Sequence, residues 1–209
     1  ASDMNMLRDS MVPSMLEFAE VNRKNFDEFT FFEIGSVFDA PDTKSPCSEH
    51  KNLCILAASK GNSEDALFYE LKGIAFALLK ILKNVEFTIS KADEGDRPWI
   101  HPVKSLAILY EGQNLGVVSS LHPQIKQKLD RKLNVAFVEL DMTAIHQIEQ
   151  KKVKYVEPSK YPGVTLDFSF LVDKAVRFEK LTADMAEFTS EILQGFEFVD
   201  IYTGKGLPE

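Results

Sequence analysis

The chain has 209 residues, of which 44% are apolar and 27% charged, so it can form one large or two small domains with a substantial core. Its net charge of −8 argues against a free-standing nucleic-acid-binding domain, because contacts with phosphates supply most of the affinity of such domains. No apolar run approaches the roughly 18–20 residues that cross a membrane, no signal peptide is recognisable, and the two cysteines indicate no disulfide scaffold, so we expect a cytoplasmic protein.

The first predicted elements are a helix and two strands. Ser10 can cap a helix whose first turn tolerates Pro13, and the spacing of the following apolar residues predicts one buried face that fades near Asn22. Residues 29–38 are nearly continuous apolar sequence, which predicts a strand covered on both faces. After a loop, residues 52–59 predict a second buried strand.

The clearest element is a helix that begins near Glu64 and shows one apolar stripe over about four turns. Its acidic start and the lysines at its end suit the helix dipole. The apolar residues of the stripe are Leu67, Phe68, Leu71, Ile74, Ala75, Leu78, Leu79 and Leu82. The elements expected next are a strand at 85–90, a hairpin of strands 105–110 and 115–121, a helical turn at 123–130, a strand at 135–140 and a short helix at 143–150.

The pattern restarts after residue 150, so we expect a first domain of residues 1–150, a linker of residues 151–156 and a second domain of residues 157–209. In the second domain a strand, a helix and a strand are predicted at 166–172, 178–192 and 196–202. A β-α-β of this size is too small to bury a core by itself. It is interpreted as half of a split β-α-β, or ferredoxin-like, domain.

Three residues in and beside the second strand could bind a metal: Cys47, His50 and Cys54. Zinc sites are usually built from closely paired ligands, and here the spacing is irregular and no fourth ligand lies nearby in the sequence. Cys54 also lies inside an apolar strand. A buried thiol and a loop thiol are therefore favoured over a metal site.

Other short motifs give no catalytic site. Gly204-Lys205-Gly206 lacks the longer glycine frame and the following helix of a phosphate-binding loop, so a turn is favoured. A catalytic histidine would need a nucleophile or carboxylate partner, and no suitable Ser or Cys motif stands out beside His101-Pro102 and His122-Pro123, so structural or hydrogen-bonding histidines are favoured. The residues alone therefore indicate an α+β protein without a recognisable active site.

Six stretches, in this order, resemble the β subunit of bacterial-type phenylalanyl-tRNA synthetase, and together they span nearly the whole chain. They are Met6 to Leu16 (MLRDSMVPSML), Phe31 to Phe38 (FFEIGSVF), His101-Pro102 with Ser105 and Ala107, Leu115-Gly116 to Leu121-His122-Pro123, Lys160 to Val164 (KYPGV) with Asp167, and Asp200-Ile201-Tyr202 with Gly204.

The resemblance implies a class II synthetase-like core without catalysis: an antiparallel sheet with flanking helices, incomplete at its start, followed by a ferredoxin-fold anticodon-binding domain truncated after Glu209. It also implies an α subunit as partner in an α2β2 assembly, and tRNA(Phe) as the RNA bound by the complete protein. No cofactor or metal is expected in this chain, while ATP and Mg²⁺ would bind the α subunit. The family's editing domain would lie upstream.

The resemblance assigns no catalytic residues to this chain. Lys160 and Tyr161 are the candidate RNA-binding residues. Thr165 and Leu166 replace an Arg-Arg pair of the family before Asp167, which removes two positive charges from that strand.

Two hypotheses follow. In the first, the chain is a scaffold that docks against the α subunit and positions tRNA for charging. In the second, it is a small-molecule-binding regulatory α+β module, although it lacks a glycine-rich or convergent polar motif.

Overall fold

The computed structural model describes residues 7–39, 47–93, 95, 97–155, 157–158, 160–173, 175–176 and 178–202. The chain divides into two compact units, residues 1–155 and 156–209, and each is considered by itself.

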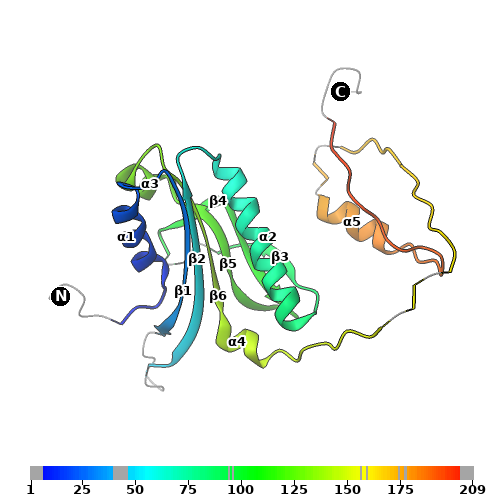
Figure 1. Ribbon diagram of the computed structural model, residues 1–209, viewed down its shortest axis with the longest axis horizontal. Coiled ribbons are helices and arrows are strands. Elements are labelled where there is room, and N and C mark those ends of the chain that lie inside the picture. The colour runs from blue at the N-terminus through cyan, green and yellow to red at the C-terminus, as the bar shows by residue number, and fades with distance from the viewer. Residues whose placement is uncertain are drawn as a thin grey trace. The chain divides into compact units, whose positions relative to one another are not determined.

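The first unit is built on a six-stranded antiparallel sheet with the order β1-β2-β6-β5-β4-β3. Helices cover both of its faces, with α2 on one side and α1 and α3 on the other (Figure 1). The strands are β1 (Glu28–Phe38), β2 (Glu49–Ser59), β3 (Thr88–Lys91), β4 (Ile100–Tyr110), β5 (Gln113–Leu121) and β6 (Asn134–Asp141). The helices are α1 (Val12–Asn22), α2 (Glu64–Lys83), α3 (Pro123–Leu129) and α4 (Met142–Gln147). The predicted antiparallel sheet with flanking helices is confirmed.

Helix α2 forms as the sequence predicts. The hydroxyl of Ser63 caps it by accepting the backbone N–H of Ala66 at 3.1 Å, and Asn84 ends it in the left-handed conformation. Its buried residues pack on β6, β5 and β2 and form the core on this face. They are Leu67, Phe68, Leu71, Ala75 and Leu79. Burial of five apolar side chains, at roughly 1.5–3 kcal/mol for each large one, makes this contact a main source of the unit's stability.

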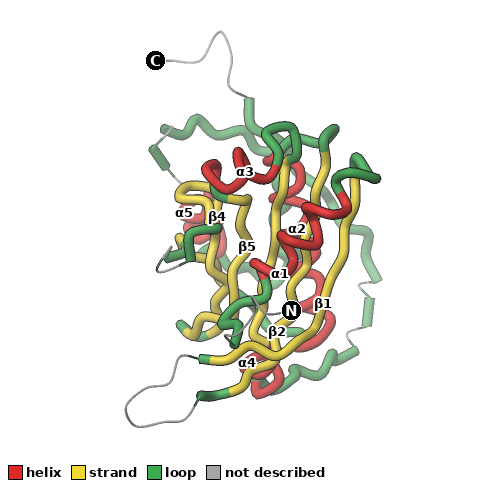
Figure 2. The backbone as a smooth tube through the Cα atoms, turned by 90° about the vertical axis from the view of Figure 1, so that its left-hand side faces the viewer, coloured by secondary structure: helices red, strands yellow, loops and turns green. Residues whose placement is uncertain are grey.

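The opposite face is closed by α1 and α3, as the second view makes plain (Figure 2). Met11, Val12, Met15 and Ala19 are buried there against β2, β5 and β6. The predicted cap of α1 differs in detail. The helix begins at Val12, and its N-cap residue Met11 has no side-chain cap; instead, the backbone N–H of Met11 donates to the buried carboxylate of Glu139 at 2.8 Å.

The prediction that the strand at 29–38 is covered on both faces is wrong. β1 is an edge strand, and α2 does not reach over it. Phe29 and Phe31 pack on the α1 side, whereas Phe32 and Ile34 remain 70% and 59% exposed on the α2 side. An apolar run shows that a strand is suited to burial, but its position in the sheet decides how many faces are covered.

The second unit contains the helix α5 (Phe178–Ala186). It is shorter than the predicted helix at 178–192 and ends before Phe188. The low helix propensity of Thr189 and Ser190 fits this early end. Residues 166–172 and 196–202 are not hydrogen-bonded as strands. In a split β-α-β, the two strands pair with a third strand that lies between them. The described residues of this unit contain no such third strand.

Candidate functional site

The candidate metal ligands do not converge. Cys47 donates to the carbonyl oxygen of Asp39 at 3.0 Å, and His50 Nε2 lies 2.7 Å from Asp39 Oδ2, whose hydrogen bond raises the pKa of His50. Cys54 is fully buried in the core under α1. Across the described parts of the chain, no three His, Cys, Asp or Glu side chains are grouped as a metal site.

The two thiols should differ in reactivity. Burial raises the pKa of the Cys54 thiol far above its ordinary range, whereas Cys47 is partly exposed. We expect one of the two cysteines to react with a thiol reagent in the native protein and both to react in denaturant. A Cys54→Ser variant should keep the fast native reaction and a Cys47→Ser variant should lose it; two fast native thiols would contradict the buried position of Cys54.

Both His-Pro histidines hold the backbone, as predicted. His101 Nδ1 accepts the backbone N–H groups of Val103 and Lys104 at 3.0 and 2.9 Å, across the bulge of β4. His122 Nδ1 accepts the N–H of Gln124 at 3.2 Å and caps α3. The other ring nitrogen of His101, Nε2, lies 3.6 Å from Glu64 Oε1.

Among the described residues of the first unit, one carboxylate is buried, and it holds the fold together. Glu139 on β6 is 3% exposed. Its oxygens accept the hydroxyl of Ser10 at 2.6 Å, the N–H of Met11 at 2.8 Å and the amide of Asn52 at 3.0 Å. This carboxylate therefore fixes the start of α1 to the sheet.

The α2-side face of β1 offers an apolar surface instead of a reactive cluster. Phe32 and Ile34 stand on it beside the buried Leu53 and Ile55 of β2. On α2, Ile74 and Ile81 are 38% and 76% exposed. At about 100° per residue, both lie on the flank of α2 away from Asp65, whose carboxylate pairs with Lys104 of β4 at 2.6 Å.

We call Phe32, Ile34, Ile74 and Ile81 the β1 face. Large apolar side chains that stay exposed on the same side of a sheet are the kind of groups that a protein partner covers. Sequence reasoning missed this face, because only the edge position of β1 exposes it.

The candidate RNA-binding residues Lys160 and Tyr161 both lie exposed in the second unit, and Tyr161 is 82% exposed. The motif Gly204-Lys205-Gly206 lies outside the described residues. None of the helices in the described part of the chain combines the length and the apolar character that a membrane span requires.

Comparison with known families gives two matches. Residues 1–142 match the family described as phenylalanyl tRNA synthetase beta chain CLM domain. Residues 159–209 match the family described as ferredoxin-fold anticodon binding domain. The second match agrees with the ferredoxin-like interpretation of the β-α-β segment.

Curated relatives align with nearly the whole length of the chain. The phenylalanine–tRNA ligase beta subunit of Bacillus subtilis is 28% identical over 100% of the chain and 27% of that protein. The corresponding protein of Syntrophus aciditrophicus is 26% identical over 99% of the chain and 26% of that protein. The chain therefore spans about a quarter of the length of these relatives.

Solved structures show the same fold at low identity. A pyrrolysyl tRNA synthetase of Desulfitobacterium hafniense superposes with a TM-score of 0.53 at 11% identity, covering 71% of this chain and 55% of that one. A second structure of the same enzyme gives a TM-score of 0.50 at 12% identity, covering 66% and 48%. At these identities the likeness concerns the fold alone.

Proposed function

Because the chain belongs to the phenylalanyl-tRNA synthetase β chain family, we propose that it acts as a docking and tRNA-positioning part of a phenylalanine–tRNA ligase. Residues 1–150 form a synthetase-like core that packs against the α subunit of an α2β2 enzyme. Residues 151–156 link it to the anticodon-binding segment, residues 157–209, which contributes to binding tRNA(Phe). Charging is carried out by the α subunit with ATP and Mg²⁺ in the cytoplasm.

The exposed β1 face is the observation that carries the docking proposal. Docking would remove Phe32 and Ile34, which are 70% and 59% exposed, from water, at roughly 25 cal/mol for each Å² of apolar surface. On both faces of the same sheet, the core between strands and helices is filled by apolar side chains. Its buried carboxylate, Glu139, is already engaged by three donors. These features support a role in docking and in positioning tRNA. Orienting tRNA can lower the activation barrier of the charging reaction.

The β1 face can be tested by pull-down of a tagged α subunit co-expressed with this chain. We expect the double variant Phe32→Asp/Ile34→Asp to weaken the complex at least about tenfold, because two charges would have to be desolvated at the interface. Val103→Asp is the control for an added surface carboxylate, since Val103 is 80% exposed on β4, outside the β1 face. Equal recovery of the double variant and the control would exclude the β1 face.

The proposal that this chain docks while the α subunit catalyses can be tested separately. The chain alone should not catalyse phenylalanine-dependent ATP–pyrophosphate exchange, and exchange by the chain alone would contradict the docking role. A rise in melting temperature with one particular amino acid or nucleotide would instead favour the regulatory small-molecule module.

A further inference from the structure

Charged side chains are distributed unevenly at the end of the sheet where α1 and α3 end. Five carboxylates of this region lie beside cations at N–O distances of 2.6 to 3.9 Å. The pairs are Asp27 with Lys60 at 2.7 Å, Asp65 with Lys104 at 2.6 Å, Asp130 with Arg23 at 3.3 Å, Glu20 with Arg23 at 3.9 Å, and Glu64 with Lys104 and Lys126, each at 3.9 Å. Each of these five carboxylates thus has at least one of four cations, Arg23, Lys60, Lys104 and Lys126, as an ion-pair partner.

Four exposed cations in the same region have no such partner among the described residues: Lys24, Lys128, Arg131 and Lys132. The Arg23–Asp130 pair ties the end of α1 to the end of α3, so Lys24 lies near the turn that carries Arg131 and Lys132. In a chain with a net charge of −8, this group forms a local positive surface.

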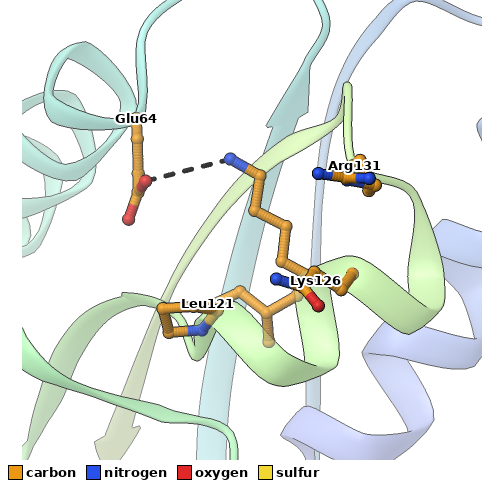
Figure 3. Close-up of a pocket in the computed structure, with 6 residues that line it drawn as sticks. Glu64, Leu121, Lys126 and Arg131 are labelled. Atoms are coloured by element: carbon orange, nitrogen blue, oxygen red, sulfur yellow. Dashed lines mark ion pairs between the residues drawn. The ribbon is translucent and has the colours of Figure 1, made fainter.

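A pocket of about 240 Å³ opens into this surface. Its lining residues are Glu64, Leu121, Pro123, Lys126, Gln127 and Arg131. Lys126 reaches across to Glu64 of α2, and Arg131 lies on the other side of Lys126 (Figure 3). The guanidinium of Arg131 has no ion pair among the described residues, so it can donate two parallel hydrogen bonds to an oxyanion.

We propose that the α3 surface, defined as Lys24, Lys126, Gln127, Lys128, Arg131 and Lys132, binds the sugar–phosphate backbone of tRNA. The inference rests on the proposed function and extends the tRNA contact from the anticodon-binding segment to the core. RNA is favoured over an acidic protein because residues 159–209 of the same chain match an anticodon-binding family. Several cations on two segments also suit a polymer that carries a phosphate at every nucleotide.

The test uses the α–β enzyme that contains this chain, with Arg131→Glu/Lys132→Glu in the β subunit. We expect the KM for tRNA to rise at least about tenfold at low salt, because phosphate contacts are lost and repulsion is added. The salt dependence of tRNA binding should also become shallower by about one to two in log–log slope. Phenylalanine-dependent ATP–pyrophosphate exchange, which needs no tRNA, should stay unchanged.

The matched control is Lys72→Glu/Lys91→Glu, which changes the net charge equally at two cations that have no ion pair among the described residues of α2 and β3. An unchanged KM for tRNA in the Arg131→Glu/Lys132→Glu enzyme, or an equal rise in the control, would overturn the proposal; an acidic protein partner would give the first of these results. Failure of the wild-type chain to form a charging enzyme with the α subunit would instead overturn the proposed function.

Discussion

Replacing Glu139 by alanine is expected to destabilise the first unit by about 3–5 kcal/mol, the largest effect of any single polar side chain in the core. The carboxylate is 3% exposed and accepts the Ser10 hydroxyl, the Met11 N–H and the Asn52 amide. Alanine would leave these donors without an acceptor in a region closed to water and would also open a cavity. The start of α1 should therefore loosen before the rest of the unit.

Urea unfolding followed by the fluorescence of Trp99 measures this loss, because Trp99 is the single tryptophan of the chain and packs against the core under α1. Glu139→Gln keeps one oxygen in place and should lose less than Glu139→Ala. Glu33→Ala is the control on the surface, since the Glu33 carboxylate is 45% exposed and its pair with Arg8 should contribute no more than about 1 kcal/mol. Equal midpoints for Glu139→Ala and Glu33→Ala would show that the buried contacts do not stabilise α1.

A methyl group at position 116 should be almost as damaging, with Gly116→Ala expected to cost about 3–5 kcal/mol. A Cβ atom there would lie 2.2 Å from the carbonyl oxygen of Glu139 and 2.9 Å from the Cα of Leu140. Both atoms belong to the backbone of β6, so the clash cannot be relieved by turning a side chain. Gly116 also has φ +152°, which L-residues rarely adopt.

Gly73→Ala is the matched control and should act in the opposite direction. Gly73 lies in the middle of α2, and a Cβ atom there would meet nothing within 4 Å. Alanine should therefore stabilise the helix by about 0.5–1 kcal/mol. Urea midpoints of the two variants should lie on opposite sides of the wild-type value, and a neutral Gly116→Ala would contradict the close approach of β5 to β6.

Local sequence patterns predicted several helices and strands of the first unit. The stripe of α2 and its acidic first turn, Glu64 and Asp65, were readable because they act within one helix. The hairpin of β4 and β5 was readable from Glu111 and Gly112, both of which adopt positive φ in the turn. In the second unit the same reasoning predicted strands at 166–172 and 196–202 that are not paired among the described residues, since a strand also needs a neighbour.

The order of six motifs in the amino-acid sequence determined the family, and the resemblance to that family implied the antiparallel α+β architecture. The local roles of His101 and His122 were also readable, because they depend on short-range geometry. The tertiary structure alone decided which surfaces remain open. It placed β1 at an edge that α2 does not reach, and it brought Glu139 to Ser10 across 129 positions of sequence. It also gathered Arg131, Lys126 and Glu64 around one pocket. Such juxtapositions arise from the packing of distant elements, which no local pattern of residues encodes.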